Sequence, residues 1–355
     1  MIQVGLFLPF ISDHWHSIER FSQLLQEKSP LLNSHLQINL IRPNQAWEKW
    51  GSSLARRGIY TASAAFHKYD VYHIVDQSYA HVLQFLPHKK VLVTCHDLEF
   101  WRKRNAKNSL IRRWMAKSLL MAGQISTPTH VIQKELFGLA QEMQLPLPIS
   151  QVIPNSCGEE FKKSLQSDPL FKKWNLQKRP LLLNLANTAW PRKNFSFLIE
   201  LLKDLKSEIS NILLIQVGPA WSAEHQHKIR QYHLTDHIKH FENLSSQEIV
   251  ELYQVADLYL QPSTYEGFGY PLLESVACNT PFLASNIDVF AELLPGHKGL
   301  LALESIAWQK EIKNILSSSE VRENLLTEQQ QLLSRYSWKN QIQSYVKIYE
   351  ALAKN

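Results

Sequence analysis

The 355-residue sequence lacks three features that would each place it quickly in a class of proteins. Its only cysteines, Cys95, Cys157 and Cys278, are widely spaced and form no Cys-x-x-Cys pair, so neither a disulfide framework nor a structural zinc site is expected. No apolar stretch approaches the roughly 20 residues that a membrane span needs. No basic leader precedes the apolar run at residues 2–11, so no signal peptide is expected. These absences favour a cytoplasmic protein.

The composition is that of a folded protein with more than one domain. Hydrophobic residues make up 45% of the chain and charged residues 20%, a balance that allows a substantial core. The length fits two domains of ordinary size. A net charge of +6 permits an anionic partner such as a nucleotide, a phospholipid surface or a nucleic acid, without choosing among them.

Short apolar runs alternate with amphipathic segments along the whole chain. Several runs are apolar on both faces, which is typical of parallel strands covered by helices on both sides. Helices are predicted at residues 195–206 and from Ser245, where Glu248 completes a capping-box spacing. The pattern predicts an α/β fold with two parallel sheets and a boundary in the polar stretch at 162–178. The predicted strands are 4–8, 37–41, 71–75, 91–95, 125–127, 151–153, 181–185, 212–217, 238–241, 258–261 and 282–284.

The segment from Gln261 to Ser275, QPSTYEGFGYPLLES, is the most informative in the chain. It follows a predicted buried strand, passes Gly267 and Gly269, and enters a helix at Pro271, a residue favoured at the first helical position. Backbone N–H groups at such a helix start form a site for phosphate or another anion. A carboxylate one turn into the helix could accept hydrogen bonds from two neighbouring hydroxyls. The alternative is an ordinary turn in which that carboxylate only favours the helix start.

A second segment joins the strand at 181–185 to the helix at 195–206. It contains Arg192 and Lys193, and two fixed cations at a strand-to-helix junction can neutralise a diphosphate. The alternative is a pair of surface charges beside a turn. The anion-binding loop expected in the same domain favours the first interpretation.

These segments together resemble the retaining glycosyltransferases of family 4, which have the GT-B fold. The resemblance rests on the E-x7-E pattern of Glu266 and Glu274 with GFGYPLL between them, and on PRKN at 191–194. Further matches are His96-Asp97, VIPN at 152–155 and YSWK at 336–339, which opens a closing helix that returns to the first domain. The resemblance implies two doubly wound Rossmann-like domains facing across a cleft. It places the acceptor domain at 1–165, the nucleotide-sugar domain at 166–335 and the returning helix at 336–355.

The family's roles can be carried over residue by residue. The resemblance implies that His96 and Glu266 lie at the donor sugar as the catalytic residues, although Asp97 beside His96 also suits a helix N-cap. It implies that Glu274 binds ribose hydroxyls and that Arg192 and Lys193 hold the diphosphate. The remaining donor-binding residues that it implies are Gly218, Leu244, Gly267, Phe268, Gly269 and Tyr270.

Two departures from the family pattern bear on function. The first loop carries Ser-Asp-His-Trp-His-Ser at 12–17 instead of a glycine pair, which leaves the acceptor side unassigned beyond guesses at Glu19 or Arg20. Ala186-Asn187 replaces a more common Val-Gly. No two aspartates stand two residues apart and no ligand cluster has metal spacing, so no metal and no cofactor is expected.

The expected function is transfer of a hexose, with retained configuration, from a GDP-mannose or UDP-hexose type donor to a saccharide or lipid-linked glycan acceptor. A role in surface polysaccharide or lipopolysaccharide synthesis is expected. The alternatives are a sugar-nucleotide epimerase of the same fold and a catalytically silent sugar-binding scaffold. A basic amphipathic segment at 102–117 predicts peripheral contact with the inner face of a membrane, with an ordinary solvated helix face as the alternative. No nucleic acid partner is expected.

Overall fold

The computed structural model describes residues 1–11, 16–50, 54–102, 109–163, 168–176 and 180–354. The chain divides into two compact units. Unit 1 comprises residues 1–155 together with 337–355, and unit 2 comprises residues 156–336. The sequence placed the corresponding boundaries after residues 165 and 335. Each unit is described below by itself.

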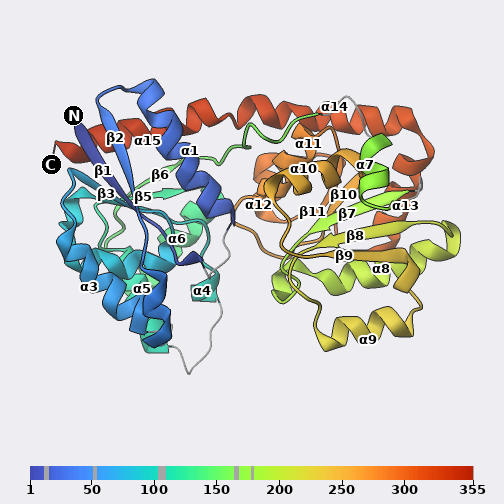
Figure 1. The fold of residues 1–355 in the computed structure, drawn as a ribbon, viewed down its shortest axis with the longest axis horizontal. Coiled ribbons are helices and arrows are strands. Elements are labelled where there is room, and N and C mark those ends of the chain that lie inside the picture. Colours follow the sequence, from blue (N-terminus) through green and yellow to red (C-terminus); the bar gives the residue numbers. More distant parts are fainter. Residues whose placement is uncertain (12–15, 51–53, 103–108, 164–167, 177–179, 355) are drawn as a thin grey trace. The chain divides into compact units, whose positions relative to one another are not determined.

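Unit 1 is built on a parallel sheet whose described strands run in the order β2-β1-β3-β4-β5-β6 (Figure 1). The strands in its centre are buried on both faces, because β3, β4 and β5 carry almost only apolar or hydroxyl side chains. The strands are β1 (Ile2–Phe7), β2 (Leu36–Ile41), β3 (Val71–Ile74), β4 (Val91–Thr94), β5 (Gln124–Thr127) and β6 (Ile149–Val152).

Helices flank this sheet, and the last helix of the chain, α15 (Trp338–Ala353), packs beside α1 (His16–Leu32). Apolar residues of both helices form one cluster with Val4, Leu92 and other strand residues. The other helices of unit 1 are α3 (Thr61–Ser63), α4 (Glu99–Arg102), α5 (Ser109–Leu119) and α6 (His130–Met143). Its short helical turns are η2 (Gln45–Trp50), η3 (Ala55–Tyr60), η4 (Ala64–Phe66), η5 (Gln77–Phe85) and η6 (His88–Lys90).

A buried hydrogen-bond network ties α15 to the sheet. The Nδ1 of His73 lies 2.8 Å from the hydroxyl of Tyr349, and its Nε2 lies 2.7 Å from the hydroxyl of Thr94. Burial, with a smaller contribution from His96, lowers the pKa of His73 to about 3. The ring is therefore neutral, with one nitrogen donating and the other accepting. The network satisfies polar groups that would otherwise be buried without partners.

Unit 2 has a second parallel sheet, with its described strands in the order β12-β11-β10-β7-β8-β9. Numbered within the unit, this is the 3-2-1-4-5-6 order of dinucleotide-binding folds, which reverses between β7 and β10. Ligands of such sheets bind beyond the carboxyl ends of the strands at this reversal. The strands are β7 (Leu181–Leu185), β8 (Leu213–Val217), β9 (Ile238–Phe241), β10 (Leu258–Gln261), β11 (Phe282–Ser285) and β12 (Leu300–Leu301).

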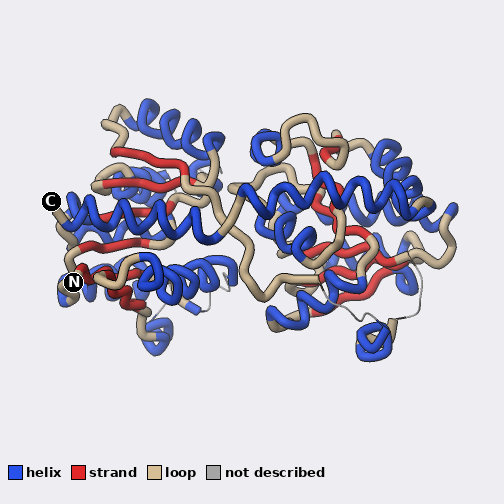
Figure 2. Tube along the Cα trace, turned by 90° about the horizontal axis from the view of Figure 1, so that it is seen from above, coloured by secondary structure: helices blue, strands red, loops and turns tan. Residues whose placement is uncertain are grey.

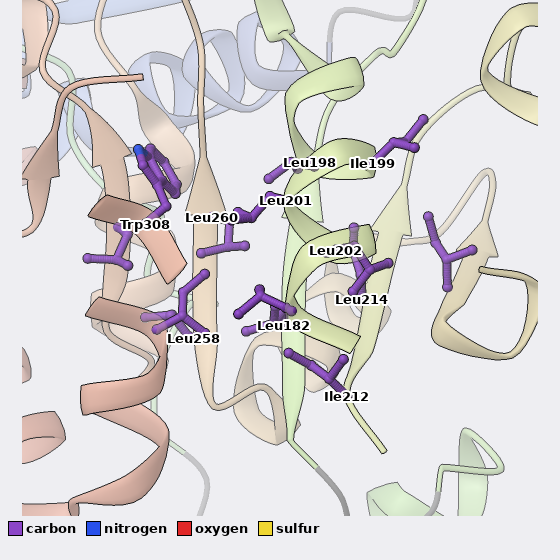
Figure 3. Packing of buried hydrophobic residues seen from close by; sticks show 14 of the residues in the cluster. Leu182, Leu198, Ile199, Leu201, Leu202, Ile212, Leu214, Leu258, Leu260 and Trp308 are labelled. Carbon is purple, nitrogen blue, oxygen red and sulfur yellow. The ribbon is translucent and has the colours of Figure 1, made fainter. Parts of the chain in front are cut away.

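The core of unit 2 lies between this sheet and the helices that cover it (Figure 2). Figure 3 shows Leu201 and Leu202 of α8 lying against leucines of β7, β8 and β10. Burying each such side chain stabilises the fold by roughly 1.5–3 kcal/mol. The helices are α7 (Asp168–Lys173), α8 (Phe195–Glu208), α9 (Ala223–Gln231), α10 (Ser246–Val255), α11 (Tyr270–Ala277), α12 (Asp288–Leu293), α13 (Ser305–Ser317) and α14 (Ser319–Arg335), with short turns η8 (Pro191–Lys193) and η9 (Thr235–His237).

The predicted α/β fold with two parallel sheets is confirmed. Each of the eleven predicted strands is present, with ends that differ by no more than two residues. The sequence missed β12, because a two-residue strand carries no periodicity to detect. The predicted helix at Phe195 and the capping box of Ser245 and Glu248 are both present.

Candidate functional site

Two loops of unit 2 meet where the strand order reverses. One follows β7 and contains Arg192 and Lys193 in η8, and the other follows β10 and contains Glu266. The backbone N–H of Thr264 donates to the carbonyl of Arg192 at 2.8 Å, which joins the loops directly. Adjacent parallel strands therefore bring together side chains that are more than 70 residues apart in the sequence.

Glu266 binds both cations of the loop after β7. Its Oε1 lies 2.6 Å from the Nζ of Lys193, and its Oε2 lies 3.1 Å from the Nη1 of Arg192. The side chains of Glu266, Arg192 and Lys193 are only 7%, 12% and 15% exposed. The same Nη1 of Arg192 also donates to the carbonyl of Tyr265 at 3.2 Å, and its guanidinium lies over the ring of Trp190. Both cations are therefore held in place before any ligand binds.

Neutral donors complete the surroundings of the Glu266 carboxylate. Ser263 Oγ donates to Oε1 at 2.7 Å and Gln261 Nε2 donates to it at 2.9 Å. Burial by itself would raise the pKa of Glu266, but the charges of Lys193 and Arg192 and the hydrogen bonds from Lys193 and Ser263 outweigh burial and lower the pKa to about 2. Glu266 is therefore ionised at neutral pH.

This cluster carries one negative and two positive charges in a largely buried position. A carboxylate can balance only one of the two cations, so one positive charge is in excess near the carboxyl ends of β7 and β10. An anion that displaced water here would gain from charge-assisted hydrogen bonds in a region of weak screening. The arrangement therefore favours an anionic ligand such as a diphosphate.

The next helix, α11 (Tyr270–Ala277), begins shortly after Glu266 in the sequence. α11 begins at Tyr270, one residue earlier than predicted, and Gly269 is its N-cap with φ of 114°. A Cβ at Gly269 would lie 2.7 Å from the ring of Phe290, so both conformation and space require glycine here. The side chain of Phe268 is only 3% exposed and packs edge-on to Tyr336, so this residue anchors the loop in the core.

Glu274 lies in the second turn of α11 and is only 3% exposed. Its Oε2 accepts a hydrogen bond from the hydroxyl of Tyr253 at 3.2 Å. Burial raises the pKa of Tyr253 well above its usual value, so the hydroxyl remains a donor. The Tyr253 hydroxyl thus lies between the carboxylate that the resemblance assigned to ribose and the carbonyl of Pro271, 3.3 Å away.

Gly218 and Leu244 follow the next two strands of the sheet. Gly218 comes directly after β8 with φ of 155°, and a Cβ there would lie 2.0 Å from the carbonyl oxygen of Ala186. Only glycine lets the loops after β7 and β8 approach so closely. Leu244 lies partly buried between β9 and α10. Trp221, which the sequence did not single out, stacks on His240 with 4.7 Å between the ring centroids. The Nε2 of His240 in turn donates to the carbonyl of Gly218 at 2.8 Å.

His96 belongs to unit 1, directly after β4. Its Nε2 donates to the carbonyl of Val75 at 3.0 Å, and burial lowers its pKa to about 4, although this hydrogen bond acts in the opposite direction. The imidazole is neutral at pH 7, with Nδ1 available in principle as an acceptor. The carboxylate of Asp97 accepts from the N–H of Glu99 at the start of α4, as a helix cap does.

The sequence missed the residues that support the predicted site. Gln261, Ser263 and Tyr253 were given no role, although a glutamine at the end of a buried strand is a detectable signal because buried amides require partners. Part of the predicted first loop, residues 12–15, lies outside the described residues. Glu19, in contrast, is described and binds Arg42 through both of its carboxylate oxygens.

The basic segment at 102–117 is described in part, since residues 103–108 lie outside the described residues. Arg102 pairs with Glu135 at 2.8 Å, and the guanidinium of Arg112 lies over the ring of Trp101. Leu110 is 82% exposed and Ile111 is 38% exposed on the same helix, α5. The described part therefore presents apolar side chains to solvent among cationic ones.

Two features are absent from the part of the chain that the structure describes. The described residues contain no group of three or more His, Cys, Asp or Glu side chains arranged to hold a metal ion. Within the same residues, every helix is too short or too polar to cross a membrane.

Residues 166–331 match the family of the glycosyl transferases group 1. The O-antigen chain mannosyltransferase RfbU of Salmonella typhimurium is 32% identical over 133 residues, 37% of each chain. The O-antigen chain mannosyltransferase B of Escherichia coli is 23% identical over 76% of this chain and 72% of its own. The chain spans less than half of the first four curated relatives that it matches, between 26% and 46% of their lengths.

Solved structures match over nearly the whole chain. Alr3699/HepE of Anabaena, in complex with UDP and glucose, has a TM-score of 0.77 at 16% identity, covering 99% of this chain and 100% of its own. The glycosyltransferase WaaG, involved in lipopolysaccharide biosynthesis, has a TM-score of 0.75 at 14% identity, covering 98% and 99%. The predicted GT-B fold is thus confirmed, and residues 166–331 are similar to the glycosyl transferases group 1.

Proposed function

We propose that the protein is a glycosyltransferase that moves a hexose from a nucleotide-diphosphate sugar to a saccharide or lipid-linked glycan acceptor. The observation that carries this proposal is the cluster of Glu266, Arg192 and Lys193, which holds an excess positive charge at the strand-order reversal of unit 2. A diphosphate supplies the negative charge that this cluster lacks. The matched family and the UDP complex of a protein with the same fold support the same donor class.

Each part of the donor has a matching group in unit 2. Lys193 and Arg192 would bind the diphosphate, with the N-terminus of α11 and the backbone of Gly267 to Tyr270 contributing to the same charge. Glu274, beside the Tyr253 hydroxyl, would accept hydrogen bonds from the ribose hydroxyls. The close approach of backbone at Gly218 and the side chain of Leu244 would border the nucleobase.

The reaction proposed is transfer with retained anomeric configuration. The bond between the anomeric carbon and the phosphate oxygen breaks, and a bond to the acceptor oxygen forms on the same face of the sugar. The departing phosphate oxygen takes the proton of the acceptor hydroxyl. Fixed cations stabilise the charge that develops on the leaving diphosphate, which is the service that a divalent metal provides in other enzymes. We therefore propose that turnover needs no metal, and incubation with EDTA tests this directly.

Glu266 is poorly suited to act as the nucleophile of a two-step mechanism. Its Oε1 already accepts three hydrogen bonds, its Oε2 accepts one from Arg192, and its low pKa makes it a weak base. These contacts support a role for Glu266 beside the donor sugar as a holder of the two cations. His96, neutral and tied to Val75, would act as a hydrogen-bond partner of a sugar hydroxyl.

The acceptor is proposed from relatives. Curated relatives include O-antigen chain mannosyltransferases and a lipopolysaccharide N-acetylglucosaminetransferase of Salmonella typhimurium. A mannosyl or related hexosyl transfer in surface polysaccharide or lipopolysaccharide synthesis follows, on the cytoplasmic side of the membrane. Unit 1 would bind the acceptor, and the cationic, partly apolar surface of α5 would contact an anionic membrane. Flotation with anionic and neutral liposomes tests the membrane contact, which requires binding to anionic liposomes alone.

Two other functions suit the same fold. A sugar-nucleotide epimerase would release an epimer and free nucleotide without any acceptor. A silent sugar-binding scaffold would show no turnover. Incubation with UDP-, GDP- and ADP-sugars, with and without a lipid-linked acceptor, separates the three. The transferase forms a new glycosidic bond only when acceptor is present, and the anomeric coupling constant of the product reports retention or inversion.

A further inference from the structure

We propose that Gln261 is a positioning residue of the donor site, which holds the Glu266 carboxylate from the sheet beneath and through it sets the places of Lys193 and Arg192. This proposal rests on the proposed function, because it gives the cluster its task of binding a diphosphate. It adds a residue that neither the E-x7-E pattern nor the PRKN segment contains.

The position of Gln261 is fixed by the sheet. It is the last residue of β10, is only 3% exposed, and lies in a strand paired with β7 and β11. Its Nε2 donates to Glu266 Oε1 at 2.9 Å, and its Oε1 accepts from the hydroxyl of Tyr259 at 3.2 Å. Because the ionised carboxylate of Glu266 can only accept, the amide is oriented with its NH2 toward Glu266 and its oxygen toward Tyr259.

The support from Gln261 does not depend on the cations. Lys193 and Arg192 reach Glu266 from the loop after β7, whereas Gln261 and Ser263 reach it from its own strand and loop. When a diphosphate takes hydrogen bonds from Lys193 and Arg192, the two neutral donors still fix the carboxylate. Glu266 then stays in place as a partner of both cations, so little rearrangement accompanies donor binding.

It also matters that the Gln261 side chain carries no charge. Replacing Gln261 by glutamate would place a second carboxylate beside Glu266 and cancel the excess positive charge of the cluster. A neighbouring carboxylate raises the pKa of one member of such a pair. Protonation at lower pH would restore a hydrogen-bond donor at position 261. The ionisable groups that surround this position are Glu266, Lys193, Arg192, Tyr259 and, through its charge on Tyr259, Glu274.

Two variants test the proposal in assays of donor turnover between pH 5.5 and 8.5. Gln261→Glu is expected to lower kcat/KM at pH 8 by about 10- to 100-fold, mainly through KM for the donor, and to recover as the pH falls. Gln261→Met, which removes the hydrogen bonds without adding charge, is expected to lower kcat/KM by about 10-fold at every pH. Gln329→Glu is the matched control, since Gln329 is fully buried and bonds only the backbone of Phe282.

The control is expected to lower the melting temperature and to leave KM for the donor and the shape of the pH profile unchanged. The proposal is overturned if Gln261→Met matches the wild type while Gln261→Glu does not, because a through-space charge effect would then suffice. It is also overturned if both variants match the wild type at all pH values. Failure of the proposed function has a different signature, because the wild type itself would then turn over no nucleotide-sugar.

Discussion

The two units contain sheets of the same kind but bury different polar groups. Unit 1 buries neutral histidines: burial lowers the pKa of His73 to about 3, and that of His81 and of His96 to about 4. These rings exchange hydrogen bonds with hydroxyls and carbonyls.

Unit 1 also buries the carboxyl side chain of Asp76, whereas unit 2 holds two cations around a buried carboxylate. Glu266 has a pKa of about 2 and lies against Arg192 and Lys193, with one positive charge in excess. Buried ions are costly unless paired, and a diphosphate would add negative charge beside these two cations. A shared parallel-sheet architecture thus leaves chemistry to the loops at its edge, and the charged cluster distinguishes the unit proposed to bind the nucleotide.

The largest effect is expected from removing a cation of the cluster. Lys193→Ala should lower kcat/KM for the donor by about 10²- to 10³-fold, because it removes a charge that stabilises the leaving diphosphate and leaves Glu266 less compensated. Steady-state kinetics with the accepted donor measures this. Lys203→Ala is the matched control, since Lys203 is half exposed and contacts Glu200 at 4.0 Å and the ring of Tyr232 rather than Glu266. Equal activity of the Lys193 variant and the wild type would show that the cluster is not part of the donor site.

A smaller effect is expected at the ribose end of the proposed donor site. Glu274→Gln keeps an acceptor for Tyr253 but loses the charge, so KM for the donor should rise about 10- to 100-fold with a smaller change in kcat. Comparing KM for the ribonucleotide-sugar and its 2′-deoxy analogue sharpens the test. The variant should discriminate less between the two donors than the wild type does. Undiminished discrimination would place the ribose elsewhere.

Lowering the pH should destabilise unit 1 before unit 2. The folded-state pKa values of His73 and His96 lie below the unfolded value of about 6.5, so the unfolded chain binds more protons between pH 6.5 and 4 and stability falls across that range. Each histidine should cost on the order of 1–2 kcal/mol by pH 5. Glu266 has a folded-state pKa of about 2 against 4.5, so its contribution is lost only below about pH 4.5.

Hydrogen exchange by mass spectrometry at pH 7 and pH 5 checks this order. Peptides from β3 and β4 should lose protection before those from β7 and β10, after correction for the intrinsic pH dependence of exchange. Burial also lowers the pKa of His225 and His297 in unit 2, so some loss near α9 and β12 is expected. Earlier opening of β10 than of β3 would contradict the contrast between the units.

Much of the fold and part of the site could be predicted from the sequence, for identifiable reasons. Continuous apolar runs between polar turns marked the strands, and the capping box at Ser245 marked α10. Strand order and register depend on long-range pairing and could not be read locally, so the contact between Glu266 and the two cations was not foreseen. The prediction had placed Glu266 by the sugar and the cations on the phosphates as separate groups.

The supporting residues were not predicted from the sequence, for a different reason. Gln261 and Tyr253 act through other side chains, and such roles depend on which atoms face each other across packed elements. The resemblance assigned Phe268 to the donor through its backbone N–H, and the structure places its side chain in the core. Motif position locates a loop but does not show which of its side chains point outward.

Calorimetric titration of UDP, GDP and ADP into the wild type and Lys193→Ala tests the central claim most directly, because it reports diphosphate binding without any acceptor. At least one nucleoside diphosphate should bind the wild type, and its affinity should fall about 30-fold or more in the variant while Lys203→Ala binds normally. Equal affinity of the two proteins for the bound nucleotide, or binding of none of the three to the folded wild type, would contradict the account.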